Sequence, residues 1–340
     1  MMCPVRHSPR AMSPLTAAFT AVLDRCLRRP VESLSLQEIQ AQRGRSHPAH
    51  PPFTWVTGPV DRRVGITYGT ATARDGYEVP LRVYRPRAVR DTETDVPVIL
   101  FFHGGGWVQG NVVMYDPLCT HLAQQVRAVV VSIDYRMAPE HKAPTAAHDC
   151  IDAARWVADR GPVLRADTTR VAVCGDSAGG NLAAVVALAS REGGGPRIAH
   201  QALVYPAVDL TLASPSIQEH AHAPVLTLAS ILAFRAHYVA QGADLRDPAL
   251  SPLFGDLRGL PPALVQTADL DPLRDDGLRY AEALRRAGVE VRATNYVRVP
   301  HGFASFPGVV PAGAQHRAEL VHELRSHLYA AEQDGGRQSG

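Results

Sequence analysis

The chain has 340 residues, of which 46% are hydrophobic and 20% charged, so it has enough apolar material for a substantial core. Its 35 basic and 33 acidic side chains give a formal charge of +2 with no basic block, which excludes an electrostatic case for nucleic-acid binding. No apolar run reaches the roughly 18 residues that a membrane span needs.

The five cysteines are scattered along the chain and form no CxxC pair. They therefore indicate neither a zinc site nor a disulfide framework. Reduced cysteines are typical of cytoplasmic proteins, so we expect a cytoplasmic location.

The N-terminal stretch "AMSPLTAAFTAVL" resembles the core of a signal peptide, but no convincing cleavage site follows it. Its apolar residues fall at helical spacing and predict an amphipathic helix: Leu15, Phe19, Val22, Leu23, Cys26 and Leu27. This helix either packs on its own protein or forms a flap over a binding site. Further on, "SHPAHPP" predicts an irregular passage within residues 29–63.

Strand-like and helical runs alternate over the rest of the chain. "RVGITYGTATARDGYEVPLRVYRP" predicts a hairpin of two strands around an Asp75–Gly76 turn. Further apolar runs predict strands at 96–103, 128–135, 170–176, 201–208, 262–269 and 289–297. Such apolar strands, separated by helices, predict an α/β fold with a mostly parallel sheet covered on both faces and an antiparallel pair at one edge. Between 211 and 246 the alternation stops, which predicts a helical insertion on top of the sheet.

Ser177 stands between Gly175 and Gly179, where a predicted strand becomes a helix. A turn that ejects a serine from a sheet leaves no room for side chains two positions before and after it, so both glycines have a structural task near the site. The helix N-terminus would favour developing negative charge at Ser177. The alternative is an ordinary strand–helix turn with Ser177 as the N-cap.

The segment "HGGGW" (103–107) follows another predicted strand. The N–H groups of Gly105 and Gly106, together with that of Ala178, are natural donors for the oxyanion of a tetrahedral intermediate. A flexible loop or a phosphate cradle is the alternative, but the Gly-Lys-Ser/Thr and GxGxxG patterns are absent. We expect His103 to position this loop by hydrogen bonding, and Trp107 either to line the mouth of the pocket or to pack in the structure.

Asp271 and His301 follow the last two predicted strands, in "LDPLRDDG" and "PHGF". A carboxylate at one strand end can orient an imidazole at the next. A metal site is a rival for the aspartates, but their spacing does not follow the EF-hand loop, and Asp271 also fits a helix N-cap before Pro272. The chain order Ser177, Asp271, His301 is that of the α/β-hydrolase triad.

On these motifs the chain resembles the hormone-sensitive-lipase-like esterases (bacterial family IV) of the α/β-hydrolase fold. The matching segments are "HGGGW" at 103–107, "DYRMAPEH" at 134–141, "GDSAGGN" at 175–181, "DPLRDDG" at 271–277 and "HGF" at 301–303. The resemblance spans most of the chain from about residue 65 onward.

The resemblance implies that Ser177 is the nucleophile, His301 the base and Asp271 its partner, with no metal and no organic cofactor. Asp176 places the chain in the "GDSAG" branch, and we expect Asp176, Trp107 and Phe303 to contact the substrate. "DDG" at 275–277 replaces the commoner "DEG".

The lid of this family implies two cap segments, and the Gly- and Ser-containing end of the sequence predicts a disordered tail, so the chain divides into five parts. These are an N-terminal cap segment (1–50), a first part of the hydrolase core (51–210), a cap insertion (211–246), a second part of the core (247–330) and a disordered tail (331–340). Homodimers through the last strand or its helix occur in the family, so a homodimer is compatible with the resemblance.

We therefore expect a serine carboxylesterase that hydrolyses short- to medium-chain acyl esters, with a small-molecule ester as its partner. One alternative is an arylacetamide-deacetylase-like amidase or a lactonase with the same triad. Another is a non-catalytic small-molecule receptor on the same fold; His301 argues against it, because that use of the fold loses the catalytic histidine.

Overall fold

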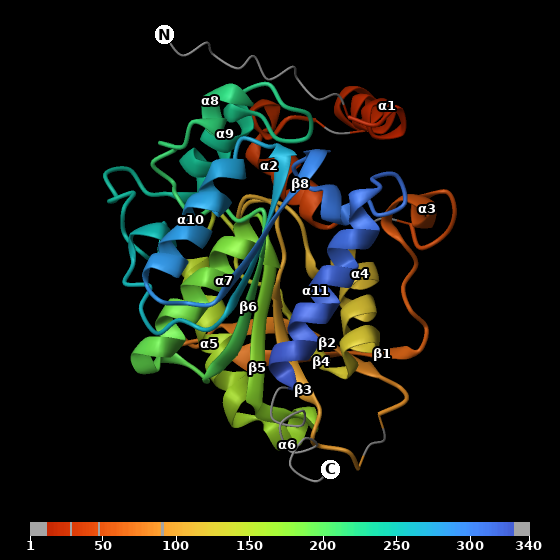
Figure 1. The fold of residues 1–340 in the computed structure, drawn as a ribbon, viewed down its shortest axis with the longest axis vertical. Helices are drawn as coiled ribbons and strands as arrows, with labels where there is room; N and C mark the ends of the chain where they lie inside the picture. The colour runs from red at the N-terminus through yellow and green to blue at the C-terminus, as the bar shows by residue number, and fades with distance from the viewer. Residues whose placement is uncertain (1–11, 28, 47, 90–91, 330–340) are drawn as a thin grey trace.

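An eight-stranded sheet forms the centre of the computed structural model, which describes residues 12–27, 29–46, 48–89 and 92–329 (Figure 1). The strand order is β1-β2-β4-β3-β5-β6-β7-β8. The strands are β1 Val64–Thr72, β2 Glu78–Pro86, β3 Pro97–Phe102, β4 Val129–Ile133, β5 Asp167–Asp176, β6 Ile198–Val204, β7 Ala263–Leu270 and β8 Val291–Pro300. Each of the eight predicted strands is present.

The edge hairpin is also confirmed. β1 and β2 pair antiparallel from Val64 opposite Pro86 to Thr72 opposite Glu78, and β2 pairs antiparallel with β4. All the remaining neighbours are parallel. Gly76 has a φ of +83° in the connecting turn, a value that glycine adopts without strain. The carboxyl ends of the parallel strands therefore meet along one edge of the sheet, where ligands bind in open α/β folds.

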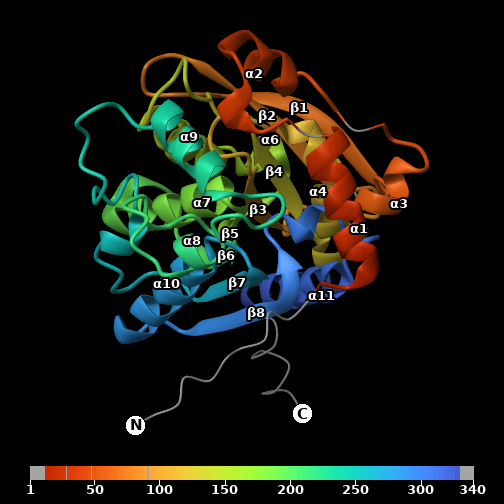
Figure 2. The same cartoon turned by 90° about the horizontal axis from the view of Figure 1, so that it is seen from above.

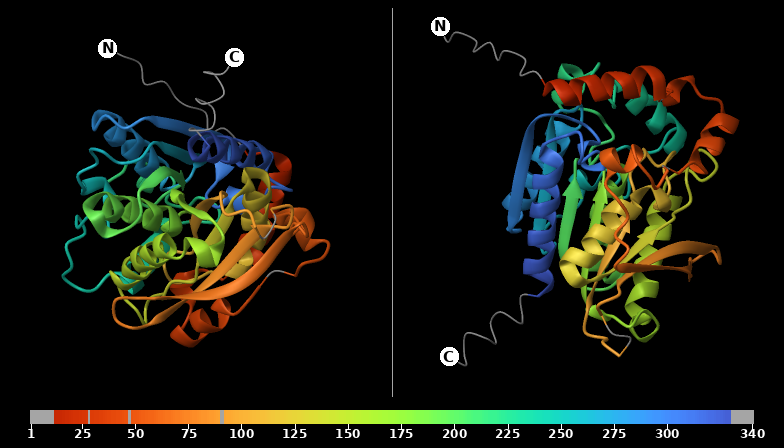
Figure 3. Two further views of the ribbon diagram at one scale, coloured as in Figure 1. Left: turned by 90° about the horizontal axis from the view of Figure 1, so that it is seen from below. Right: turned by 90° about the vertical axis from the view of Figure 1, so that its right-hand side faces the viewer.

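Helices cover both faces of the sheet (Figure 3). The α-helices are α1 Pro14–Val22, α2 Leu36–Arg43, α3 Phe53–Thr57, α4 Asp116–Leu122, α5 Thr145–Asp159, α6 Gly161–Leu164, α7 Ala178–Ala189, α8 Ser216–Glu219, α9 Leu228–Tyr238, α10 Arg274–Arg286 and α11 Ala312–Leu328. Short 3₁₀ and π segments are η1 Leu23–Leu27, η2 Val31–Ser33, η3 Val112–Tyr115, η4 Ala123–Arg127, η5 Ser190–Gly194, η6 Pro252–Phe254 and η7 Phe303–Ser305.

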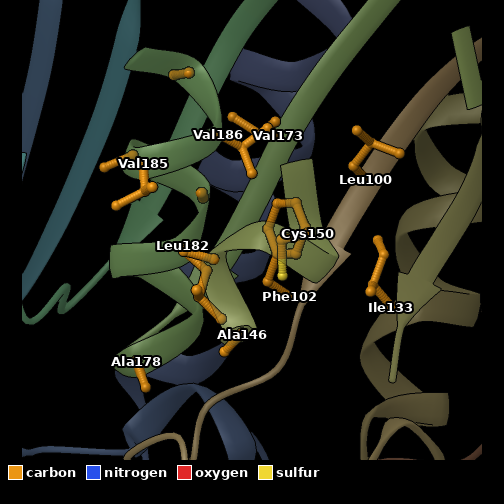
Figure 4. Packing of buried hydrophobic residues seen from close by; sticks show 14 of the residues in the cluster. Leu100, Phe102, Ile133, Ala146, Cys150, Val173, Ala178, Leu182, Val185 and Val186 are labelled. Atoms are coloured by element: carbon orange, nitrogen blue, oxygen red, sulfur yellow. The ribbon is translucent and has the colours of Figure 1, made fainter. Parts of the chain in front are cut away.

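Alternate side chains of each buried strand point to opposite faces of the sheet and pack into two different hydrophobic cores. On one face, Phe102 and Val173 pack with Cys150 of α5 and with Leu182 and Val186 of α7 (Figure 4). On the other face, side chains of α4 and α11 pack against the sheet. Because both faces are buried, the strands read in the sequence as nearly continuous apolar runs, which is why they could be predicted.

The N-terminal helices and the 211–246 segment lie together above the carboxyl ends of the strands, as Figure 2 shows for α1, α2, α8 and α9. Two contacts join the two segments directly. The Ser230 hydroxyl lies 3.0 Å from Oε2 of Glu32, and the Val225 N–H donates to Oδ2 of Asp24 at 3.1 Å. Segments almost 200 residues apart in the chain thus form one layer over the sheet.

Helix α1 is present as predicted, but its predicted apolar face is only partly correct: Phe19, Leu23 and Leu27 line a cavity, as a flap over a binding site would, whereas other members of the set do not pack on the protein. Its buried residues are Thr16 and Thr20, whereas Leu15 and Val22 are 58% and 50% exposed. The Thr16 hydroxyl donates to the Val309 carbonyl at 3.1 Å, so polar anchoring decides which side of the helix faces the protein.

A second helix, α2, was not predicted within the stretch 29–63. It begins with a capping box in which Ser35 accepts from the Glu38 N–H and Glu38 accepts from the Ser35 N–H. The pattern "SLQE" carries this signal in the sequence.

Within the described ranges, no helix has both the length and the apolar character needed to cross a membrane. The four cysteines of these ranges are free thiols, and three of them are buried. The predicted disordered tail, 331–340, lies outside the described residues, as do residues 1–11 of the predicted cap segment.

Candidate active site

Ser177 sits on a sharp turn between β5 and α7. Its φ and ψ are 55° and −119°, a conformation that non-glycine residues adopt only when the surroundings impose it. The Ser177 N–H donates to the Val204 carbonyl at 2.8 Å, which holds the turn against β6. Ser177 occupies the N-cap position, but its side chain makes no capping hydrogen bond, so the alternative of an ordinary capping serine is wrong.

The two glycines around Ser177 are required by contact with backbone atoms. A Cβ on Gly175 would lie 2.3 Å from the Gly179 carbonyl oxygen, and a Cβ on Gly179 would lie 2.0 Å from the Phe102 carbonyl oxygen. Neither neighbour can move without displacing β3 or the turn itself. The turn from Gly175 to Gly179, called the elbow below, is therefore built by backbone packing, and Ser177 is its outermost side chain.

A chain of two hydrogen bonds links Ser177 to two residues from other strand ends. His301 Nε2 lies 2.9 Å from Ser177 Oγ, and His301 Nδ1 lies 2.7 Å from Asp271 Oδ2. An ionised carboxylate can only accept, so Nδ1 carries the proton and Nε2 is left to accept from the serine hydroxyl. The ring is 7% exposed and Asp271 is fully buried.

Asp271 is not a helix cap. Its Oδ1 accepts from the Leu273 N–H at 2.8 Å, and α10 begins only at Arg274. Its two carboxylate oxygens thus have different tasks, since one fixes the loop after β7 and the other faces the imidazole.

The "HGGGW" loop passes beside the elbow with an unusual backbone. Gly105 and Gly106 have φ values of +121° and +63°, and Trp107 has +60°. Among the residues that the structure describes, the N–H groups of Gly105, Gly106 and Ala178 have no hydrogen-bond acceptor. Because these three residues line the same cavity as Ser177, their donors remain available to a ligand.

The carboxylate of Asp176 connects the elbow to this loop. Its Oδ1 accepts from the Gly104 N–H at 2.9 Å, and its Oδ2 accepts from the hydroxyls of Tyr115 at 3.1 Å and Tyr205 at 3.3 Å. Burial raises the pKa of Asp176 to about 6, while the hydrogen bond from Tyr115 favours the ionised form. Asp176 is 6% exposed and is one of the residues that line the cavity.

Tyr115 and Tyr205 were missed by sequence reasoning. Each lies outside the motifs that pointed to the site, and no spacing rule relates them to Asp176. The tyrosines become recognisable only when the fold brings η3, β6 and the elbow together.

Three other residues named from the sequence lie in different surroundings. His103 is fully buried, stacks on Tyr135 at 4.4 Å, and its Nδ1 lies 2.8 Å from the Gly104 carbonyl oxygen, which agrees with a loop-positioning role. Trp107 lines the cavity and also stacks on Tyr238 at 4.4 Å. Phe303 does not line the cavity.

The position of Phe303 requires a correction to its predicted contact with substrate. Its ring is fully buried and packs against the rings of Tyr205, Tyr296 and His316, at centroid distances of 5.5, 5.0 and 5.5 Å. It follows His301 by two residues, and the intervening Gly302, with a φ of +76°, turns the chain back into the protein. Phe303 therefore supports the loop that carries His301 from behind.

A cavity of about 880 Å³ opens above Ser177 and His301. Its floor is the elbow and the glycine loop, and its walls come mainly from apolar side chains of the N-terminal and 211–246 segments, among them Phe19, Leu23, Leu226, Ile231 and Phe234. This combination of an apolar enclosure with a few convergent polar groups is typical of small-molecule sites.

No cluster of histidine, cysteine and carboxylate groups with metal-ligand spacing lies at Ser177 in the described part of the chain. Within those residues, one such group is found elsewhere, at His200, Glu323 and His327. This group lies away from Ser177 along the strands. His200 pairs with Ala172 of β5, whereas Val204 pairs with Asp176, the residue next to Ser177.

Comparison with known proteins agrees with this fold. Residues 99–305 match a family described as having the alpha/beta hydrolase fold. The carboxylesterase NlhH of Mycobacterium tuberculosis is 44% identical over 74% of this chain and 80% of its own, and an ethyl acetate hydrolase of Pseudomonas putida is 35% identical over 80% of this chain and 86% of its own. The structure of a hyperthermophilic esterase from the archaeon Pyrobaculum calidifontis superposes with a TM-score of 0.80 at 36% identity, covering 93% of this chain and 98% of that one.

Proposed function

The chain belongs to the alpha/beta hydrolase family and is a carboxylic ester hydrolase, and we propose that it acts as a serine esterase on short- to medium-chain acyl esters. The observation that carries the proposal is the hydrogen-bond chain from Asp271 through His301 to Ser177, with distances of 2.7 and 2.9 Å.

In the first half of the reaction, Ser177 Oγ attacks the ester carbonyl carbon and His301 Nε2 takes the serine proton. Asp271 holds the ring in the tautomer that can accept this proton and stabilises the imidazolium that forms. The tetrahedral intermediate then collapses. The imidazolium gives its proton to the leaving alcohol, and the acyl group stays on Ser177.

In the second half, a water molecule takes the place of the alcohol. His301 removes its proton as the water attacks the acyl carbonyl, and the proton returns to Ser177 Oγ as the acid leaves. Gly105, Gly106 and Ala178 would donate to the oxyanion in both halves, since their N–H groups face the cavity without another acceptor among the described residues.

We assign Asp176 the role of a positioning residue. It directly precedes Ser177 in the chain and accepts from the Gly104 N–H, so it fixes the distance between the nucleophile and the "HGGGW" loop. The hydroxyls of Tyr115 and Tyr205 hold its second oxygen. A carboxylate with three donors in a buried site is rigid, and rigidity here preserves the aim of the backbone donors.

The two segments above the sheet would act as the cap that selects the acyl chain. The ring of Phe234 of α9 packs directly on the "HGGGW" loop. A Cβ on Gly106 would lie only 2.4 Å from this ring. The space beside the serine is therefore closed on one side by an aromatic wall, which favours short acyl groups. The relative named as an ethyl acetate hydrolase supports the same preference.

The test is an acyl-length series of p-nitrophenyl esters from acetate to palmitate, measured on the full chain and on Ser177→Ala. We expect turnover to fall steeply beyond medium-length chains, and Ser177→Ala to abolish it at every length. Activity that rises toward palmitate would contradict the chain-length proposal, and activity retained by Ser177→Ala would contradict the mechanism. An anilide measured beside the matching ester decides between esterase and amidase.

The homodimer and the cytoplasmic location stay predictions. Sedimentation of the purified chain tests the first, and the distribution of the protein after cell fractionation tests the second.

A further inference from the structure

Three side chains with metal-binding groups meet between β6 and α11, at a distance along the strands from Ser177. His200 comes from β6, and Glu323 and His327 lie one turn apart on α11. One ligand atom from each lies within 4.8 Å of the other two. The spacing of Glu323 and His327, four residues apart on a helix, places both on the same face toward the strand.

His200 lacks the partners that a buried imidazole requires. The residue is 0% exposed, and within the described residues neither ring nitrogen makes a regular hydrogen bond. Leaving a buried donor and acceptor unpaired has a substantial cost, so such a group calls for an explanation. The nearby Pro262 carbonyl interacts with the ring, but it serves at most one of the two nitrogens.

Glu323 and His327 also have side-chain atoms that are available as metal ligands. The His327 ring stacks on that of His200 with centroids 4.3 Å apart and an angle of 8°, and its Nε2 lies 3.7 Å from Glu323 Oε2, too far for a hydrogen bond. Glu323 Oε1 accepts from Arg292 at 3.2 Å, which leaves Oε2 toward the histidines.

We propose that His200, Glu323 and His327 bind a divalent transition-metal ion of the zinc class. Two imidazole nitrogens and one carboxylate oxygen form a ligand set that zinc accepts, with a water molecule as the fourth ligand. Arg292 would fix the carboxylate from outside, and the Pro262 carbonyl would orient the ring of His200.

Binding requires a small adjustment in the outer ligands. Bond lengths of about 2.0–2.1 Å place tetrahedral ligand atoms roughly 3.4 Å apart, closer than the present spacing. The side chain of His327 is 21% exposed and lies near the end of α11, so it can turn out of the stack and also open the path for the ion. His200, fixed in the strand, would stay in place.

The proposed site would clamp the C-terminal half of α11 to β6, so its effect is on stability rather than on catalysis. It is independent of the esterase proposal, because no residue of the site touches Ser177, His301 or Asp271. A metal that binds only the folded chain raises its stability by mass action.

The experiment uses the full chain without an affinity tag, stripped of metal with a chelator. Zn²⁺ is titrated in competition with a chromophoric chelator, and Co²⁺ is titrated separately because a four-coordinate site gives intense visible bands. We expect one equivalent to bind. His327→Ala should weaken binding by more than the roughly 10- to 100-fold that loss of an outer partner causes, and Glu323→Gln should weaken it as well.

His322→Ala is the matched control, since His322 is an exposed histidine on the same helix outside the cluster. It should bind like the unmodified chain. Zn²⁺ should also raise the melting temperature of the unmodified chain and of His322→Ala, but not that of His327→Ala. Equal affinity in the unmodified chain and in His327→Ala would overturn the proposal, as would loss of binding in the control.

Discussion

The floor and the roof of the cavity are built in different ways. On the floor, the polar side chains have defined partners, as in the Asp271–His301–Ser177 chain, and Gly175 and Gly179 are fixed by backbone atoms at 2.0–2.3 Å from a hypothetical Cβ. The roof presents mainly apolar side chains such as Phe19, Ile231 and Phe234. The chemistry therefore depends on backbone geometry, whereas substrate choice depends on side chains that can be exchanged.

The largest loss is expected on the floor, at Asp271. Asp271→Asn keeps the shape of the side chain but removes the preference for the productive tautomer of His301, so kcat should fall by about 10⁴-fold. Asp269→Asn is the control, because among the described residues the side chain of this nearby aspartate accepts one hydrogen bond, from the Arg298 N–H at 3.3 Å, and lies outside the triad. Steady-state kinetics that show equal losses for the two variants would contradict the assignment.

The next largest effect tests the contact between floor and roof. Gly105→Ala and Gly106→Ala keep the backbone N–H but displace it, because alanine is strained at the positive φ of each position. Each should therefore lower kcat by up to about 10²–10³-fold, the typical result of losing one oxyanion donor. They differ in what the new methyl group meets. At Gly105 it would lie 2.0 Å from the Gln109 carbonyl oxygen, whereas at Gly106 it would lie 2.4 Å from the Phe234 ring.

Phe234→Ala should therefore restore part of the activity of Gly106→Ala, since the backbone strain at the positive φ remains, and none of that of Gly105→Ala. The three single variants and the two double variants are compared by kcat on one short ester. Equal rescue of both glycine variants, or of neither, would show that the roof does not press on the loop in the way described.

A smaller loss is expected at Asp176, which joins two parts of the floor. Asp176→Asn removes a charged acceptor worth about 1.5–3 kcal/mol per hydrogen bond, so kcat should fall by about 10- to 100-fold while KM changes little. Tyr115→Phe and Tyr205→Phe each remove one donor and should have weaker effects of the same kind. A rise in KM at constant kcat would instead indicate direct contact with the substrate.

The smallest expected effect is a pH dependence of stability caused by Asp276. Its side chain accepts a hydrogen bond from the hydroxyl of Ser214 in the 211–246 segment. Burial, together with the nearby Asp209 carboxylate, raises the pKa of Asp276 from 3.8 to about 8. The folded chain therefore keeps a proton that the unfolded chain releases, and stability falls as the pH rises from about 4 to about 8.

The expected slope from this one group is about 1.4 kcal/mol per pH unit. Urea unfolding of the unmodified chain and of Asp276→Asn between about pH 5.5 and 7.5 measures it as the difference between the two slopes. Parallel curves would mean that Asp276 is already ionised in the folded protein.

The sequence predicted the floor much better than the roof. The strands were visible because both faces of the sheet are buried, and Ser177, Asp271 and His301 each follow a strand. The side of α1 that packs on the protein was predicted only in part, because the Thr16 hydroxyl anchors the helix to the Val309 carbonyl, and hydrophobic spacing does not report such a contact. The partners Tyr115 and Tyr205 could not be found, since their distance from Asp176 along the chain carries no periodic signal.

The central claim is that Ser177, activated by His301, carries the acyl group. The most direct measurement mixes the enzyme with excess p-nitrophenyl phosphonate and identifies the modified residue by peptide mass spectrometry. The account predicts stoichiometric release of p-nitrophenol with the phosphonyl group on Ser177, and labelling slowed by orders of magnitude in His301→Ala. Modification of another residue, or equal labelling rates with and without His301, would contradict it.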